Sequence, residues 1–429
     1  MRVSRTYHID DTGVFKDKLL FWAHQFNEVA WLDSNDFPQK YSSYDVLLAV
    51  DAFTSLRTDY HSAFDDLNAF QSNIKDWLFG YLSYDLKNAV EDLESNNYDG
   101  LEFPDLYFFQ PKKVFLLKDN QLEVQYLNMV DNEIDTDFKA IHDSIPIKGH
   151  QASEPIKIKL RIHKDEYFEK VDRMLAHIQR GDIYEANFCQ EFYAEDSQID
   201  PLQTYWHLND ISKAPFACYL KLGKEFLLSA SPERYLKKEG NTIISQPIKG
   251  TAKRMKNGMA DSAIARKLSQ DEKERSENIM IVDLVRNDLS KTAKKGTVKV
   301  SELCKVYSFE QVHQMISTVT SEVEDSLNPV EVLHTTYPMG SMTGAPKISA
   351  MKIIEELEET KRGLYSGAVG YFTPEGDFDF NVVIRSILYN SSKQYISYSV
   401  GGAITAKSNP QKEYEECLLK AKAMREVLE

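Results

Sequence analysis

One lysine in this chain has the surroundings of a nucleophile. Lys249 follows the β-favouring run from Thr242 to Ile244 and stands between Ile248 and Gly250. Apolar flanks hinder the solvation of an ammonium group, burial lowers the pKa of a lysine amine, and a neutral amine is a nucleophile. The alternative is a lysine whose stem lies along a strand end while its charge reaches solvent.

A glutamate at another strand end is a candidate proton donor for this lysine. Glu233 lies in the segment 229–234, shortly before the strand of Lys249. If the two segments form a hairpin, the two side chains become neighbours, and a carboxyl beside a nucleophilic amine can act as a general acid. A plain ion pair is the alternative, and it would keep the lysine charged and unreactive.

Two predicted helices each carry a pair of glutamates on one face. Glu274 and Glu277 are three residues apart, as are Glu413 and Glu416, so the carboxylates of each pair project from the same side. Lys420 continues the second stripe one turn later. Opposed pairs of hard oxygen ligands suit Mg²⁺, which binds six oxygens and usually keeps several waters. The same spacing is also typical of solvated helix surface, so the pattern by itself leaves both interpretations open.

An anion site is predicted around a loop of small residues and an arginine. Residues 340–347, which include Thr343 and Gly344, lead into a helix whose free N–H groups and dipole favour a carboxylate or phosphate. Arg385 is predicted on the apolar strand 381–387, where a guanidinium requires a carboxylate from the protein or from a ligand. Gly401 supplies backbone that a ligand can approach closely. A well-capped helix and an internal ion pair are the structural alternatives.

The elements that must position these residues indicate an α+β fold with large mixed or antiparallel sheets and flanking helices. Residues 1–155 are rich in aromatic side chains and short alternating runs, which predicts a β-rich N-terminal region. Residues 148–155 read as a connector, and residues 156–429 form the second predicted domain. Its strands and helices are mixed without regular βαβ alternation, as in α+β proteins. One long helix is predicted over 261–284.

Composition limits the possible partners and compartment. The 429 residues carry 51 basic and 66 acidic side chains, a net charge of −15, which argues against general binding of nucleic acid or anionic lipid. The four cysteines are scattered, so we expect a reducing compartment without a disulfide frame or zinc site. Neither a signal peptide nor an apolar run long enough to cross a bilayer is evident. We therefore expect a soluble cytoplasmic protein.

Taken in order, the segments that carry these residues resemble the chorismate-utilising enzymes. The similarity covers roughly residues 160–429, with a weaker match at 31–34 and 79–85. The matching segments are 247–251, 274–288, 343–347, 365–371, 381–385 and the run Glu413-x-x-Glu416-x-x-x-Lys420. The resemblance implies a fold like that of anthranilate synthase component I and a site for chorismate.

The same resemblance implies a role for each candidate residue. The carboxylates that would hold Mg²⁺, and through it the ring carboxylate of chorismate, are Glu274, Glu277, Glu413 and Glu416. The groups that would bind the enolpyruvyl carboxylate are Tyr365, Arg385 and the backbone of Gly401. Lys420 would lie near the metal-bound carboxylate and His313 near the ring, with Thr343 and Gly344 in the same site.

Within this family, Lys249 separates two activities. Aminodeoxychorismate synthases carry Lys at this position and anthranilate synthases typically carry Ala, so the resemblance implies the first activity, on the route to 4-aminobenzoate and folate. Lys249 would attack C2 of chorismate, Glu233 would protonate the departing C4 hydroxyl, and ammonia would enter at C4. Anthranilate synthase component I is the alternative. Among residues that differ from the common family pattern is Glu185, where relatives often have Gln.

The source of ammonia is expected to be a separate subunit. The chain has no Gly-x-Cys-x-Gly nucleophile elbow with a downstream histidine, so it lacks the signature of a glutamine-hydrolysing domain. A partner glutamine amidotransferase would then supply ammonia. Two other classes agree less well with the sequence: a non-catalytic relative, against which the intact motif residues argue, and a pyridoxal enzyme, for which no phosphate cup is found.

Overall fold

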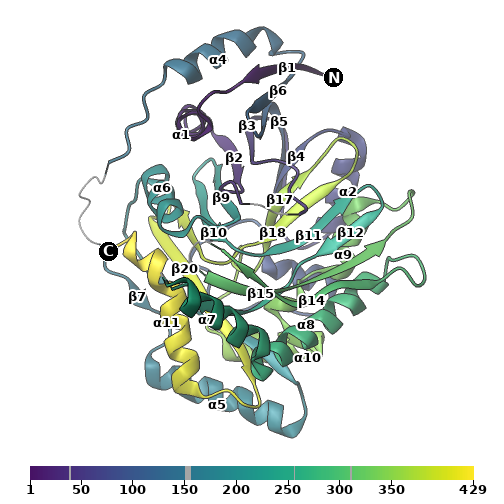
Figure 1. The fold of residues 1–429 in the computed structure, drawn as a ribbon, viewed down its shortest axis with the longest axis vertical. Coiled ribbons are helices and arrows are strands. Elements are labelled where there is room, and N and C mark those ends of the chain that lie inside the picture. The colour runs from purple at the N-terminus through teal and green to yellow at the C-terminus, as the bar shows by residue number, and fades with distance from the viewer. Residues whose placement is uncertain (38–39, 150–155, 256, 310–311) are drawn as a thin grey trace.

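Strands from the N-terminal part of the chain pair directly with strands that follow residue 200. The computed structural model describes residues 1–37, 40–149, 156–255, 257–309 and 312–429 (Figure 1). β2 (Glu28–Asp33) pairs with β9 (Phe216–Leu222), and β4 (Leu78–Leu82) pairs with β17 (Ala368–Phe372). Most of the predicted connector, residues 150–155, lies outside the described residues, and the division into two domains stays a prediction.

All pairings between named strands are antiparallel, which confirms the predicted large antiparallel sheet with flanking helices. The other strands are β1 Arg2–His8, β3 Val46–Thr58, β5 Leu106–Lys118, β6 Gln121–Leu127, β7 Lys159–Leu160, β8 Glu185–Ala194, β10 Glu225–Ser231, β11 Arg234–Glu239, β12 Thr242–Ser245, β13 Ile248–Lys253, β14 Lys299–Ser308, β15 Val312–Glu322, β16 Gly344–Ala345, β18 Phe378–Val382, β19 Ser386–Asn390 and β20 Tyr395–Thr405.

The strands form two arms that meet at β5. One arm runs β5–β3–β2–β9–β10–β19–β20–β8, and the other runs β5–β4–β17–β18–β11–β12–β15, with β13 and β14 also paired to β15. Apolar side chains of both arms fill the space between them, among them Phe79, Phe108 and Leu236, all fully buried. Residues far apart in the sequence therefore share one core.

Helices cover the outer faces of the two arms. They are α1 Thr12–Ala23, α2 Ala63–Ile74, α3 Lys87–Val90, α4 Ile134–Asp143, α5 Lys164–Arg180, α6 Pro201–Ser212, α7 Gly258–Gln270, α8 Glu272–Ser290, α9 Pro329–Thr336, α10 Lys347–Leu357 and α11 Pro410–Glu426. α11 packs on β20, and α7 and α8 pack on β13–β15. Figure 1 shows α5, α7, α8, α10 and α11 gathered at one end, with α1 and α4 at the other.

Local capping explains where the two glutamate-bearing helices begin. Asp271 accepts hydrogen bonds from the backbone N–H groups of Lys273 and Glu274, and so ends α7 and starts α8. The predicted single helix over 261–284 is thus two helices. Asn409 caps α11, with Pro410 in its first turn.

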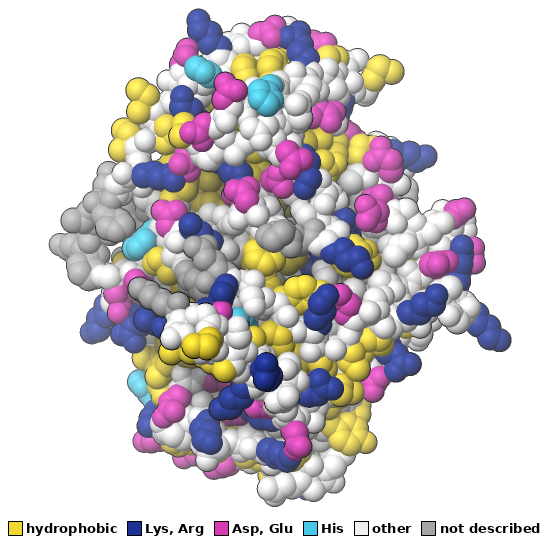
Figure 2. All heavy atoms as spheres, viewed as in Figure 1, with side chains coloured by type: hydrophobic (Ala, Val, Ile, Leu, Met, Phe, Trp, Pro, Cys, Tyr) yellow, Lys and Arg dark blue, Asp and Glu magenta, His cyan; other side chains and the backbone are white. Residues whose placement is uncertain are grey.

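Two surface and composition expectations are also addressed by the structure. Acidic and basic side chains are interspersed over the face in Figure 2, without a broad area of one sign. The four cysteines are buried and free. Within the described ranges, no helix has the length and apolar character that crossing a bilayer requires.

Candidate active site

Lys249 lies on a strand that is bent towards the flanking helices. The β-favouring run that starts at Thr242 ends at Ser245, and a second strand starts at Ile248. Pro247 separates them, because it offers no N–H to the ladder, and its carbonyl accepts from Ser317 N at 3.2 Å. β13 then pairs with β15 with a register shift between Ile248 and Thr251. Gly250 has a φ of +85°, and such bulges re-aim the neighbouring side chain.

Four carboxyl groups of the described structure interact electrostatically with the Lys249 amine. Burial raises the pKa of Glu185, Glu233 and Glu277, and the charge of Lys249 opposes this rise in all three. Glu416 also feels the lysine charge. No carboxylate among the described residues comes within 4.0 Å of the Lys249 ammonium, and none accepts a hydrogen bond from it. The amine is therefore free to meet a ligand.

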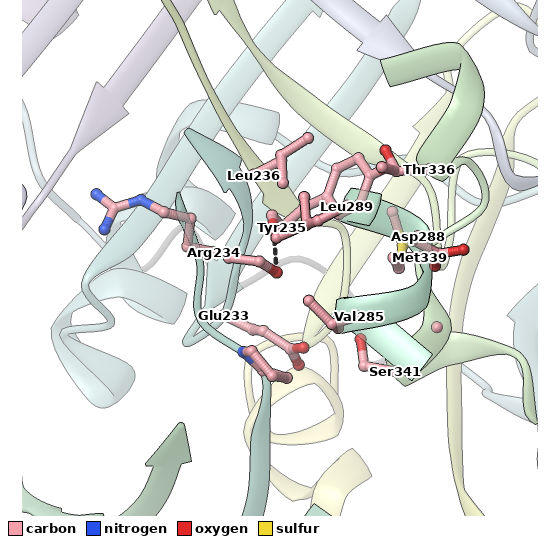
Figure 3. Close-up of a pocket in the computed structure, with 13 residues that line it drawn as sticks. Glu233, Arg234, Tyr235, Leu236, Val285, Asp288, Leu289, Thr336, Met339 and Ser341 are labelled. Carbon is pink, nitrogen blue, oxygen red and sulfur yellow. Dashed lines mark hydrogen bonds between the residues drawn. The ribbon is translucent and has the colours of Figure 1, made fainter. Parts of the chain in front are cut away.

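Glu233 has the properties of a proton donor near neutral pH. β11 and β12 form an antiparallel hairpin, which brings Glu233 beside Ile248. Burial raises the pKa of Glu233 to about 7, while hydrogen bonds from the Ser341 hydroxyl and the Ile248 N–H limit the rise. The side chain borders a cavity of about 20 Å³, enough for one water, and Figure 3 shows its carboxyl pointing towards Ser341.

The two glutamate pairs face each other across α8 and α11. The Lys273 ammonium lies 3.7 Å from Glu277 Oε1 and 3.8 Å from Glu413 Oε1, so one lysine bridges the two helices. Burial raises the pKa of Glu274, and the charge of Glu277 raises it further. Glu416 is paired with Lys420 at 2.7 Å.

These carboxylates fit a hydrated divalent ion. Over the described parts of the chain, no three His, Cys, Asp or Glu side chains are close enough together to chelate an ion directly. Glu277 Oε1 is nevertheless buried without a hydrogen-bond donor, and Glu413 is also buried. An orphaned oxygen among hard oxygen donors matches Mg²⁺, which keeps part of its water shell.

Arg385 is a partly buried cation without an ion-pair partner among the described residues. The prediction that it lies on a strand is wrong: Val382 ends β18, and Arg385 sits in the bend before β19 with a φ of +54°. Burial lowers the pKa of its guanidinium, and interactions with Tyr365 and Glu416 oppose the decrease. No described residue accepts a hydrogen bond or forms an ion pair with it. A partly buried guanidinium without a protein acceptor is suited to an anionic ligand.

Tyr365 and Gly401 lie against the same cysteine. The Tyr365 hydroxyl donates to Cys189 Sγ at 3.7 Å, and a Cβ on Gly401 would lie 2.4 Å from that sulfur. Lys420 Nζ donates to the Gly401 carbonyl at 2.8 Å. A Cβ on Gly402 would lie 3.6 Å from Glu413 Oε2. Through Gly401 and Gly402, β20 therefore links the surroundings of Tyr365 to the glutamates of α11.

In the loop of small residues, the Thr343 hydroxyl and the Lys347 ammonium both have partners within the protein. Thr343 donates to the Gly340 carbonyl at 3.2 Å, and Lys347 Nζ lies 2.6 Å from Asp288 Oδ2. Gly344 pairs with Ala186 on β8, where a Cβ would lie 2.2 Å from the carbonyl oxygen of Glu185. Thr343 and Gly344 thus fix the loop against β8.

Both ring nitrogens of His313 have partners within the protein. Its Nε2 lies 3.0 Å from Asp261 Oδ1 on α7, and its Nδ1 lies 2.8 Å from the Ser308 hydroxyl. Arg254 donates a hydrogen bond to Asp261 Oδ2 at 2.8 Å. The described contacts do not join His313 to Lys249, so its predicted place near the substrate ring stays a prediction.

Two residues of the cluster gave no functional signal in the sequence. Lys273 stands four residues before Glu277, the spacing of an ordinary surface ion pair. Ser341 lies in the loop of small residues, and only the fold places it on Glu233. For Glu185, the sequence indicates only a departure from the family pattern.

Comparisons with known proteins agree in one family. The family model described as "chorismate binding enzyme" matches residues 27–426. The chain is 36% identical over 355 residues to an anthranilate synthase component I-like protein of Synechocystis sp., covering 82% of this chain and 72% of that protein. It is 31% identical over 388 residues to aminodeoxychorismate synthase component 1 of Bacillus subtilis, covering 88% and 80%.

A solved structure gives the same fold. Anthranilate synthase component I from Streptococcus pneumoniae superposes with a TM-score of 0.78 at 24% identity, over 91% of this chain and 93% of that one. This likeness agrees with the predicted fold type.

Proposed function

Since the chain belongs to the chorismate-binding enzyme family, we propose that it is an aminodeoxychorismate synthase component I. This transferase would convert chorismate and ammonia to 4-amino-4-deoxychorismate and water. The observation that supports the proposal most is the Lys249 amine, which has no ion pair within 4.0 Å among the described residues and stands near a carboxyl with a pKa of about 7, that of Glu233.

The two groups would divide the chemistry between them. Lys249, after passing its ammonium proton to Glu233, forms a bond to C2 while the ring double bond shifts and the C4–O bond breaks. Glu233 gives its proton to the departing oxygen, which leaves as water, because hydroxide is a poor leaving group. Ammonia then bonds to C4, the double bond shifts back, and the C2–N bond breaks to release the lysine amine. One proton of the new ammonium group returns to Glu233.

Substrate binding would rest on the cations of the site. Chorismate carries two carboxylates, and Arg385 is a partly buried guanidinium without a protein partner in the described structure. Tyr365, the Gly401 backbone and Lys420 would complete the contacts. Glu274, Glu277, Glu413 and Glu416 would hold Mg²⁺, which when bound would offset the negative charge of the carboxylates.

The ammonia would come from a partner glutamine amidotransferase, and the product would serve 4-aminobenzoate and folate synthesis. Both follow from the family resemblance and the missing nucleophile elbow. The chain would act in the cytoplasm.

Anthranilate synthase component I is the second candidate, because a relative of that type is 36% identical over 82% of this chain. The ring product separates the two. Anthranilate synthase yields anthranilate, whereas the proposed activity keeps a 4-amino group and the enolpyruvyl side chain.

A single assay tests the proposal. The purified chain is incubated with chorismate, Mg²⁺ and an ammonium salt, and the product is identified by mass. We expect 4-amino-4-deoxychorismate from the wild type and from the control Lys253→Ala, an exposed lysine on the same strand. Anthranilate as the main product would replace the proposal by the second candidate.

A further inference from the structure

Glu185 is a buried carboxylate that the proposed chemistry does not use. Its exposed fraction is 0%, and neither of its carboxylate oxygens has a hydrogen-bond donor in the described structure. Buried polar groups are nearly always paired, because an unpaired one loses its hydration without compensation. Both oxygens of one carboxylate left unpaired therefore point to a ligand.

The position of Glu185 places this carboxylate at the inner edge of the site. It is the first residue of β8 and pairs with Thr405 on β20 and Ala345 on β16. The preceding residue, Tyr184, is 70% exposed. The neighbour of Glu185 in the chain is therefore at the surface. The Glu185 carboxylate itself is enclosed, and it interacts electrostatically with Lys249.

The charges around Glu185 favour a positively charged ligand. The acidic groups of this cluster are Glu185, Glu233, Glu274, Glu277, Glu413 and Glu416, and the basic ones are Lys249, Lys273, Lys420 and Arg385. Six acids face four bases, and two of the bases, Lys273 and Lys420, already pair with the helix glutamates. In the proposed complex the charge of Mg²⁺ and the two carboxylates of chorismate cancel each other, so the excess of negative charge remains. A second anion beside Glu185 would be repelled, whereas a small cation would reduce this excess.

We propose that Glu185 binds the ammonium ion that supplies the incoming nitrogen. The inference rests on the proposed function, which requires an ammonia-derived nucleophile in this site. Ammonium is suited to this carboxylate because it is a compact cation whose N–H groups can donate to both carboxylate oxygens at once. The loop that leads into β16 contacts both glutamates, since Ser341 lines the same cavity as Glu233 and Ala345 pairs with Glu185. The bound nitrogen would therefore lie on the Glu233 side of the site, where the lysine adduct forms.

The role is one of binding and positioning, so it predicts a specific kinetic pattern. Without the carboxylate, ammonium is held less well, but chorismate still binds through Arg385. For Glu185→Gln we expect the KM for ammonium to rise at least about tenfold, the order expected for losing a hydrogen bond to a charged group. The kcat at saturating ammonium and the KM for chorismate should stay within about threefold.

The experiment measures initial rates of the full chain with saturating chorismate and varied ammonium chloride, at ionic strength held constant with sodium chloride. Glu185→Asp keeps the charge and should retain most of the ammonium affinity. Glu225→Gln is the matched control: Glu225 is also a buried glutamate with one unpaired oxygen, but it pairs with Arg57 on β3. Thermal unfolding of each variant verifies that it is folded.

The outcomes separate the inference from the function on which it rests. An unchanged KM for ammonium in Glu185→Gln, in an enzyme that forms the 4-amino product, overturns the inference alone. A raised KM for chorismate with unchanged ammonium dependence overturns it too, since the carboxylate would then contact the organic substrate. If the wild type makes anthranilate, the proposed function fails, and the ammonium dependence of the variant still decides the role of Glu185.

Discussion

Replacing Glu233 by glutamine tests two consequences of one buried carboxyl. Burial raises the pKa of Glu233 to about 7 from the 4.5 of an exposed glutamate. At about 1.4 kcal/mol for each pKa unit, this carboxyl lowers the free energy of unfolding by roughly 3 kcal/mol at high pH relative to low pH. The decrease starts above pH 4.5, where the unfolded chain releases the proton first, and it is complete once the pH exceeds 7.

Glutamine keeps the shape of the side chain but does not titrate. The free energy of unfolding of Glu233→Gln, relative to wild type, should therefore increase by roughly 3 kcal/mol between pH 4.5 and pH 8. Urea unfolding followed by tryptophan fluorescence at several pH values measures this difference. Glu239→Gln, an exposed glutamate at the end of β11, is the control and should show no such trend. A constant difference for Glu233→Gln would show that this carboxyl titrates normally in the folded protein.

The same variant should lose catalysis. A positioned general acid contributes about 10²- to 10⁴-fold to rate, so the formation of 4-amino-4-deoxychorismate should fall by that factor while chorismate binding is kept. In the wild type, kcat/KM for chorismate should decline as the pH rises past about 7, because Glu233 must be protonated to donate. Near-normal turnover by Glu233→Gln would refute its role as the acid.

Further predictions concern the nucleophile, the metal and the ammonia source. Lys249→Ala should lose most of the ammonia-dependent 4-amino product, and Lys249→Arg should do no better because a guanidinium stays charged; a Lys249→Ala rate within about twofold of wild type would mean a structural lysine. Chelation should abolish turnover, and added Mg²⁺ should restore it. Glu277→Gln should lower the turnover rate at least about 10²-fold. Full activity in excess EDTA would contradict a role for the metal ion. The isolated chain should use ammonium salts and not glutamine, as product analysis with each nitrogen source will show.

Local rules predicted the parts of the site that lie close together in sequence. Helical spacing correctly indicated that Glu274 and Glu277 share a face, because three residues make almost one turn. The hairpin rule anticipated that Glu233 and Lys249 would be neighbours, since β11 and β12 are separated by a short turn. The apolar alternating runs predicted the antiparallel strands in the same way.

Other features depend on contacts that no local rule contains. Arg385 follows an apolar run that continues the strand pattern, but the chain bends there and the strand ends at Val382. The helix break at Asp271 has a capping signal, which the strong helical periodicity on either side conceals. Glu185 becomes significant only through burial, because an acidic residue at the start of a surface strand is commonplace.

The short run from Pro247 to Thr251 shows how a local motif directs a side chain towards partners that are remote in sequence. Pro247 interrupts the ladder, and Gly250 adopts a φ of +85° that other residues rarely take, so the register shifts between Ile248 and Thr251. A Cβ on Gly250 would lie 3.0 Å from Glu274 Oε2, so the absence of a side chain also lets β13 approach α8. The motif thus determines where Lys249 points, whereas β8, α8 and α11 determine the charges that it meets there.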